Sequence, residues 1–477
     1  MRPGDGPEAA VSRAGTAAAV ILVTGWIAAV AISWPGHLSY DSIVQLHDGR
    51  TGFYHSWHPP IMAWLLGLGD AVVRGTGLFI AFDATLAFGA LVSLLWIGPR
   101  VSWAAAAAAA VIILLPQFLL YQGIVWKDVL FADASVAGFA FLAHAEKRWL
   151  HARPRFASIG GAFVLFVVAT LTRQNGLIVL VAGAAALFVI ASRGESAKRA
   201  MLHAGGALAG ALVLAAAIAF ALAARSDGAE GPRAQLDLLR LYDLVGAVVA
   251  EPWLPLDRLK ADDPELERSI RTDGVRLYSP QRNDTLVGSQ ALQDALSGAP
   301  SGLLAAQWSD LVFHHPRLYL STRADVFWWV FATPDLGACR PVYVGVDGPA
   351  GEMADLGLAP RMLPRDRALA RYAQGFMGTP VFSHVAYGIL ALVALLVLLH
   401  RRSAGDIAIA FLLIGALAFA ASFFAIAIAC DYRYLYFLDL ASLTAMFYLA
   451  LDPAYLFQVL AMWSGSSWVL RSEARKS

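Results

Sequence analysis

The chain of 477 residues is poor in charge, because only 15% of its residues are charged whereas 58% are hydrophobic. This excludes a soluble protein of this length and predicts an all-α polytopic membrane protein. The net charge is +1, so the sequence lacks the basic excess that nucleic-acid binding requires. We therefore expect membrane lipids, and no nucleic acid, among the partners.

Cysteine is also scarce, with Cys339 and Cys430 as the two in the chain. Two cysteines exclude a disulfide framework and a cysteine metal cluster. Both fall on the same side of the membrane in the topology given below, which allows a single disulfide without requiring one. The sequence shows no repeat of fixed period, and the lack of an inverted repeat disfavours a transporter.

Long hydrophobic runs dominate what is present, and about ten have spanning length. The first follows Arg13 and lacks a small-residue cleavage site, which predicts a retained span and not a signal peptide. The apolar segment 61–73 is too short to cross, and we expect a juxtamembrane helix lying along the interface. The predicted spans are 17–34, 78–97, 103–120, 129–145, 157–172, 177–192, 203–223, 381–399, 406–428 and 434–451.

The basic residues then fix the topology, because cytoplasmic loops are enriched in Lys and Arg. If 61–73 does not cross, the basic loops share the side of the N-terminus, whereas a crossing there would place the cluster at 147–155 outside. We therefore expect a multi-pass protein of the plasma (inner) membrane with both termini in the cytoplasm. The residues that support this are Arg100, Lys147, Arg148, Arg153, Arg155, Arg193, Lys198, Arg199, Arg401, Arg402, Arg471, Arg475 and Lys476.

The long segment 225–380 is predicted to be an extracytoplasmic subdomain, since it is too long to be structureless. Within it, 319–331 carries Trp328 and Trp329 and resembles an interfacial helix. An eleventh crossing there is disfavoured because it would move Arg401 and Arg402 outside. The predicted organisation is a transmembrane module at 1–224 with a first catalytic loop at 36–76, the subdomain at 225–380, transmembrane helices at 381–453 and a cytoplasmic tail at 454–477.

Polar residues gather in the loops of the extracytoplasmic side. Asp41 opens the first loop, which ends in Trp57-His58-Pro59-Pro60, and Lys127-Asp128 starts a later span. A charge at the bilayer centre costs roughly 2.5–3.5 kcal/mol on insertion scales, so acids inside spans must face protein or water. Those acids are Asp83, Asp133 and Asp439. The other polar candidates are Arg173 and Asn175 in a third turn, and Arg433 and Tyr434 before the last span.

This set of residues suits transfer from a phosphate-linked donor. A lipid phosphate leaving group needs cations, which Lys127, Arg173 and Arg433 supply. A hydroxyl or amine acceptor needs a base, for which Asp41 is the candidate, while Asp128 would position the acceptor or cations.

Each of these residues also has a structural explanation. Asp41 could cap a helix, Lys127-Asp128 could form a self-satisfying ion pair, and the two arginines could reach for headgroups. His58 could pack against Trp57. The tyrosines at 432, 434 and 436 could be aromatic-belt residues, although one could line the donor site.

The order of these elements resembles the GT-C superfamily of integral membrane glycosyltransferases, in particular protein O-mannosyltransferases and bacterial lipid A aminoarabinose transferases. Asp41 resembles the acid of their first loop, His58-Pro59-Pro60 the residues before the juxtamembrane helix, and Asp128 the second acid. The turn 172–176 is similar to a Thr-Lys-Gly-like turn, and 433–436 to an Arg-Tyr-Leu-Tyr stretch. The chain departs in having Ser42 where many relatives carry a second acid, and Arg plus two extra residues where Lys-Gly is usual.

The resemblance implies an inverting glycosyltransferase that moves a sugar from a polyprenyl-phosphate-linked donor to a cell-envelope glycan, lipid or protein. His58, Asn175 and Tyr434 are then expected with Lys127, Arg173 and Arg433 at the donor phosphate. Two acids beside a phosphate could hold a divalent cation, so metal dependence is left open. The alternatives are a transporter or flippase of lipid-linked sugars that makes no bond, and a noncatalytic assembly subunit.

Overall fold

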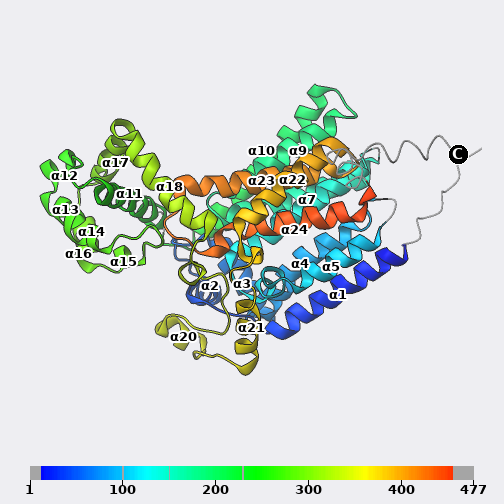
Figure 1. Ribbon diagram of the computed structural model, residues 1–477, viewed down its shortest axis with the longest axis horizontal. Helices are drawn as coiled ribbons and strands as arrows, with labels where there is room; N and C mark the ends of the chain where they lie inside the picture. Colours follow the sequence, from blue (N-terminus) through cyan, green and yellow to red (C-terminus); the bar gives the residue numbers. More distant parts are fainter. Residues whose placement is uncertain (1–11, 99–100, 150, 228–229, 455–477) are drawn as a thin grey trace, which may run out of the picture.

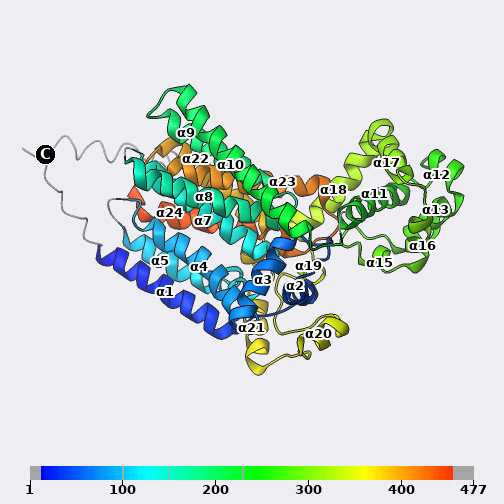
Figure 2. The same ribbon diagram turned by 180° about the vertical axis from the view of Figure 1, so that it is seen from behind.

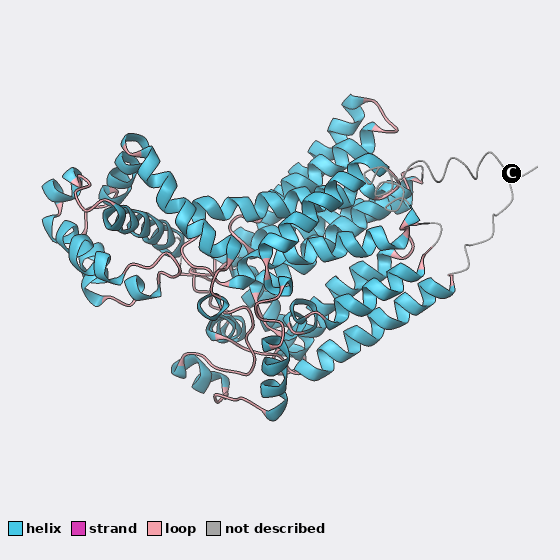
Figure 3. Ribbon diagram, in the orientation of Figure 1, coloured by secondary structure: helices cyan, strands magenta, loops and turns pink. Residues whose placement is uncertain are grey.

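The computed structural model describes residues 12–98, 101–149, 151–227 and 230–454, and these residues form helices joined by loops (Figure 3). In these ranges the only extended pairings are isolated β-bridges. Arg100 and the predicted tail residues 455–477, which include Arg471, Arg475 and Lys476, lie outside the described residues. The predicted all-α fold is confirmed.

The main body is a bundle of long apolar helices. Within the described ranges, eight are long and apolar enough to cross a membrane, and a ninth candidate is α5 (Trp103–Leu114) followed by Pro116–Gly123, bent by 72°. Helix α9 (Leu177–Ser192) is shorter and completes the approximate count of ten. The eight are α1 (Arg13–Ser33), α4 (Gly77–Leu94), α7 (Lys127–Lys147), α8 (Ala152–Thr172), α10 (Ala197–Ala223), α22 (His384–Arg401), α23 (Asp406–Ile426) and α24 (Tyr436–Leu451). The chain is therefore an α-helical multi-pass membrane protein.

Helix α7 lies at the centre of the bundle, in contact with α4, α8, α23 and α24 (Figure 1). The three acids predicted to face protein or water are all buried. Asp439 on α24 accepts hydrogen bonds from the Tyr432 hydroxyl at 2.7 Å and lies 2.8 Å from Nδ1 of His384. Asp83 on α4 and Asp133 on α7 lie beside each other inside the bundle. These carboxyl groups thus face other helices and not lipid.

Helices α2 (Tyr40–Thr51) and α3 (Pro60–Val72) pack on each other at one end of the bundle. Before α3, His58 lies near Asp41, and after it Thr76 donates a hydrogen bond to the carbonyl of Pro35 at 2.8 Å, just beyond the end of α1. Both ends of α3 therefore lie at the same end of the bundle, as predicted for a helix that does not cross. Gly49 and Gly67 make the α2–α3 contact so close that a Cβ on Gly67 would lie 2.2 Å from the carbonyl oxygen of Gly49.

The first part of the segment 225–380, which was predicted to be one subdomain, forms a helical lobe beyond this end of the bundle (Figure 2). Helix α18 (Pro316–Ala332) connects the lobe to the bundle by packing against α22 and α23. It is the predicted interfacial helix, and its Trp328 is 61% exposed; its depth relative to a bilayer stays a prediction. The lobe consists of α11 (Glu230–Ala250), α12 (Asp257–Asp262), α13 (Pro264–Ser269), α14 (Val275–Leu277), α15 (Asp284–Val287), α16 (Gln290–Gly298) and α17 (Leu303–His314).

After α18 the chain returns to the bundle through three short helices. Helix α20 packs against α2, and Leu38 pairs with Val346 through their backbones. The side chain of Tyr372, on α21, contacts the carbonyl of Leu114 at the end of α5. The returning segment thus packs on α2 through α20. The three helices are α19 (Leu336–Cys339), α20 (Ala350–Leu356) and α21 (Pro364–Gln374).

Candidate active site

The candidate site lies at the end of the bundle that carries α2 and α3, where several helices begin or end. Asp41 lies in the first turn of α2, His58 just before α3, and Lys127 and Asp128 in the first turn of α7. Arg173 follows the last residue of α8, and Arg433 lies in the 3-10 turn Tyr432–Leu435 that leads into α24. Residues separated by almost 400 positions in the sequence are thus brought to one place.

Asp41 is free for this site because another residue caps α2. The backbone N–H of Ser39 donates to the Ser42 hydroxyl at 3.2 Å, and the two hydroxyls lie 3.1 Å apart. Asp41 instead accepts a hydrogen bond from Arg433 at 2.7 Å, and its other oxygen lies 3.7 Å from Nε2 of His58. The alternative that Asp41 is the helix cap is therefore wrong.

His58 and Lys127 contact each other, with Lys127 Nζ 3.1 Å from His58 Nδ1. Burial and the nearby ammonium of Lys127 lower the pKa of His58 to about 3, so the imidazole is neutral at physiological pH. A neutral ring can accept the Lys127 hydrogen bond at Nδ1, and its proton then sits on Nε2, the nitrogen that faces Asp41. His58 thus connects the ammonium to the candidate base.

Asp128 pairs with Arg173 and not with its neighbour Lys127, so the self-satisfying pair expected as the alternative does not form. The Arg173 guanidinium lies over the rings of Tyr434, at 5.2 Å, and Phe423, at 5.5 Å. Its side chain is 10% exposed. Arg173 is therefore held inside the protein by an acid and aromatic faces, which excludes a simple headgroup-seeking role.

Arg433 is shared by three carboxylates. It lies 2.7 Å from Asp41, 3.3 Å from Asp431 and 3.8 Å from Asp128, and its guanidinium is 4.9 Å from the centre of the Trp126 ring. Burial acts to raise the pKa of Asp41, but Arg433, and with it His58 and Lys127, holds the pKa of that carboxyl well below its usual range. Asp41 is therefore ionised at physiological pH.

The remaining predicted site residues divide into two groups. The Tyr434 ring lies near both Arg173 and Arg433, at 5.2 and 5.8 Å, so it lines the site. Asn175 points elsewhere, because its amide donates to the Ser422 hydroxyl on α23 at 2.8 Å. The structure does not bring Asn175 into contact with the cluster. Tyr432 and Tyr436 are buried in the bundle and are not aromatic-belt residues.

Two residues at the site were missed by the sequence analysis. Asp431 lies two positions before Arg433 and directly precedes the same turn, and Trp126 directly precedes Lys127-Asp128. Asp431 could have been predicted as a site residue, because it lies so close in the sequence to the candidate cation Arg433. Trp126 carried no comparable signal, since an aromatic residue at a span end is usually explained by the membrane interface.

The acids considered for a divalent cation both face arginines, Asp41 facing Arg433 and Asp128 facing Arg173 and Arg433. A cation there would have to displace a guanidinium, so this donor set does not favour one. Across the part of the chain that the structure describes, no group of three or more His, Cys, Asp or Glu side chains is placed to hold a metal ion.

The fold and site thus define a multi-pass membrane protein with a buried, charged centre at one end of its bundle. No family model and no curated protein matches the sequence. Among solved structures, it is similar to the oligosaccharyltransferase of Archaeoglobus fulgidus in complex with zinc and sulfate, with a TM-score of 0.40, 16% identity, and coverage of 93% of this chain and 50% of that one.

Two further oligosaccharyltransferase structures from the same archaeon are similar at the same level. The complex of AglB with an inhibitory peptide and a dolichol-phosphate has a TM-score of 0.39 and 13% identity, and covers 93% of this chain and 51% of that one. The apo form has a TM-score of 0.39 and 15% identity, with 94% and 52% covered. This chain spans about half the length of these proteins, and at such low TM-scores the likeness carries no conclusion about activity.

Proposed function

We propose that the chain is a GT-C-type, inverting membrane glycosyltransferase that uses a polyprenyl-phosphate-linked sugar. The observation that carries the proposal is the convergence of three cations, Lys127, Arg173 and Arg433, around two neighbouring carboxylates, with Lys127 and Arg433 near Asp41 and with Arg173 and Arg433 at Asp128. A phosphate-linked donor needs such cations for its leaving group, and a nearby carboxylate can serve the acceptor. The acceptor would be a cell-envelope glycan, lipid or protein, and the reaction would occur on the extracytoplasmic side.

In the proposed reaction, the acceptor oxygen or nitrogen forms a bond to the anomeric carbon of the sugar. The bond from that carbon to the phosphate oxygen breaks, and its electron pair stays on the phosphate. The acceptor proton passes to the carboxylate of Asp41. Attack from the face opposite the leaving group inverts the anomeric centre, with charge developing as in other glycosyl transfers.

Arg433 links donor binding to the basicity of Asp41. Its guanidinium is 2.7 Å from Asp41, and this contact helps to hold the pKa of that carboxyl low and so keeps it a weak base. A donor phosphate would compete for the same guanidinium. Once Arg433 turns toward the phosphate, the pKa of Asp41 rises toward its usual range, so the base strengthens when the donor is bound.

The direct test is Asp41→Asn in purified, lipid-reconstituted protein given a labelled polyprenyl-phosphate sugar. We expect donor binding to persist and transfer to fall by about 10²–10⁴-fold, the usual contribution of a general base. The matched control is Asp355→Asn, which removes an exposed carboxylate on α20 that lies beside His47 and not in the cluster. It should transfer sugar as the wild type does.

Unchanged turnover in Asp41→Asn would contradict the proposed base. Movement of labelled donor across liposomes without any product would favour a flippase. A chelator titration of the wild-type protein, read as transfer rate, decides separately whether a divalent cation takes part.

A further inference from the structure

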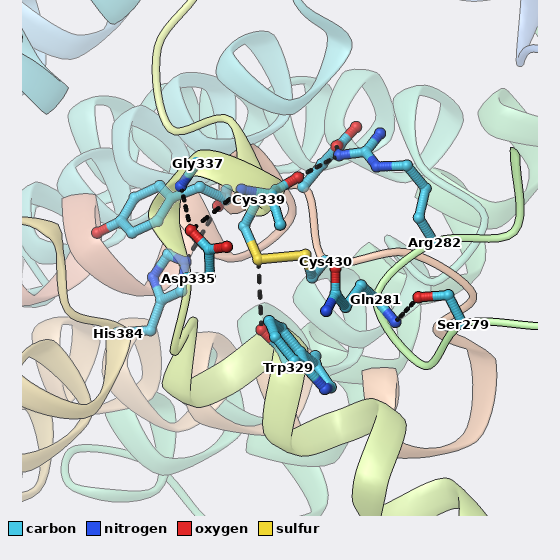
Figure 4. Close-up of a disulfide and its surroundings, with 12 residues drawn as sticks. Ser279, Gln281, Arg282, Trp329, Asp335, Gly337, Cys339, His384 and Cys430 are labelled. Atoms are coloured by element: carbon cyan, nitrogen blue, oxygen red, sulfur yellow. Dashed lines mark hydrogen bonds and ion pairs between the residues drawn. A yellow bond between two sulfur atoms is a disulfide. The ribbon is translucent and has the colours of Figure 1, made fainter.

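The segment just before Arg433 is fastened to the rest of the chain by a disulfide. Cys430 is bonded to Cys339, which lies 91 residues earlier at the end of α19, with the two Cα atoms 5.0 Å apart (Figure 4). The backbone N–H of Cys430 also donates to the carbonyl of Gln281 at 2.9 Å. Three stretches of the chain, those that contain Gln281, Cys339 and Cys430, thus meet just before Arg433.

Arg282 of the lobe joins the two sides of this junction. Its guanidinium donates to Oδ1 of Asp431 at 2.8 Å and to the carbonyl of Ala338 at 2.7 Å. Asp431 follows Cys430, and Ala338 precedes Cys339, so Arg282 spans the residues next to each sulfur. Figure 4 shows the Arg282 side chain beside the disulfide. The position of the Arg282 guanidinium therefore depends on the two chain segments that the disulfide joins.

Asp431 transmits this arrangement to the candidate site. Its Oδ1 accepts from Arg282, and its Oδ2 accepts from Nη2 of Arg433 at 3.3 Å, the same nitrogen that donates to Asp41. The three side chains are mostly buried, with 12–20% of each exposed. Because Arg282 holds one oxygen of the Asp431 carboxylate, the other oxygen has a fixed position, and this orients the Arg433 guanidinium that donates to it.

We propose that Asp431 and Arg282 are positioning residues for Arg433, and that the Cys339–Cys430 disulfide keeps them in place, so that donor-phosphate binding depends on the oxidised state of the two cysteines. This proposal rests on the proposed function, because it assigns Arg433 to the donor phosphate. Neither positioning residue needs to touch the substrate. Reduction would require two thiols of an external dithiol, which become a disulfide as Cys339 and Cys430 take up two protons and two electrons.

The first test is Asp431→Asn in the full-length protein, with the donor KM and kcat measured separately. The substitution removes the charged hydrogen bond between Asp431 and Arg433, so the Arg433 guanidinium is no longer held in the orientation that binds the donor phosphate. We therefore expect the donor KM to rise by about tenfold or more while kcat changes less. Asp431→Glu should restore part of the KM. The control is Asp284→Asn, because Asp284 contacts the other side of Arg282 at 3.3 Å and is 63% exposed; it should keep the wild-type KM.

The second test is reduction of the wild-type protein with dithiothreitol. It should raise the donor KM in the same way, and reoxidation should restore it. The variant with both Cys339→Ser and Cys430→Ser should have the raised KM from the start and should not respond to dithiothreitol. If that variant does not fold, as judged by size-exclusion chromatography, the wild-type protein decides the disulfide dependence: an unchanged donor KM after complete reduction of Cys339 and Cys430 would overturn it.

An unchanged KM in folded Asp431→Asn protein would overturn the positioning role, and a dithiothreitol effect that persists without the cysteines would overturn the disulfide dependence. Failure of the proposed function would look different, since the wild-type protein would then neither bind nor use the lipid-linked sugar. A wild type that loses transfer on Asp41→Asn but is indifferent to Asp431→Asn would refute the positioning role alone.

Discussion

The two ends of the helix bundle use the same residue types in different ways. At the end opposite the candidate site, arginines meet acids pair by pair, as Arg193 does with Glu146 at 3.0 Å and Arg155 with Glu195 at 3.1 Å. At the site end, one guanidinium, Arg433, is divided among three acids, and the hydrogen bond of Lys127 goes to a histidine ring.

The difference separates charges that hold helices together from charges that are available to a ligand. A cation with an acid entirely its own is already satisfied, so an arriving phosphate gains little by competing for it. Arg173 is not in this position, because its partner Asp128 is shared with Arg433. A cation bonded only to a neutral imidazole, as Lys127 is, keeps its full charge for a further anion. Arg433 lies 3.3 and 3.8 Å from Asp431 and Asp128, and a phosphate oxygen can replace these longer contacts. The comparison assigns binding to the site end and structural pairing to the opposite end.

The largest expected effect comes from exchanging a buried arginine at each end for methionine. Arg433→Met leaves the partly buried Asp41 without its arginine, and Arg401→Met leaves the buried Asp406 without its arginine. Each change should lower the free energy of unfolding by roughly 3–5 kcal/mol. Only Arg433→Met should also weaken binding of the lipid-linked sugar, by about 100-fold or more. Denaturant titration and donor binding, measured on the same detergent-solubilised samples, check both statements. Equal donor binding in the two variants would contradict the assignment of donor binding to the site end alone.

Lys127→Met should have an intermediate effect that is confined to the donor. The ammonium hydrogen-bonds a neutral imidazole, so its removal leaves no acid whose sole partner it was, and stability should change little. A hydrogen bond to a charged group contributes about 1.5–3 kcal/mol, so we expect the donor KM to rise by about 10- to 100-fold. A large drop in Tm without a change in KM would show that Lys127 is structural.

The smallest expected effect is the pH dependence contributed by His58. Its pKa is about 3 in the folded chain and near its usual 6.5 when unfolded, so the unfolded state binds more protons between these values. Its contribution to stability is therefore fully present above pH 6.5 and is lost as the pH falls toward 3, by at most about 1.4 kcal/mol per pH unit. His58→Gln should flatten that slope in denaturant titrations between pH 6.5 and 4. An unchanged slope would place the loss elsewhere.

Span positions, the short helix α3 and the grouping of polar loops could be predicted from the sequence, because hydrophobic run length and charge asymmetry are local properties. Asp41, Lys127, Arg173 and Arg433 were candidates for the same reason, since each lies at the end of a run. The partners of these residues could not be predicted in this way. Their separation in the sequence says nothing about which atoms approach, and Asn175, equally polar and equally placed, turns to α23 instead.

The sequence by itself determined that this is a multi-pass helical membrane protein with its candidate chemistry collected at the span ends. The tertiary structure alone decided that Asp41, freed from capping by Ser39, faces Arg433, and that Cys339 and Cys430 join beside Asp431. The physical reason is that the hydrophobicity of a continuous segment decides whether that segment lies in the membrane. The pairing of charges is set by side-chain directions, which packing fixes to within an ångström.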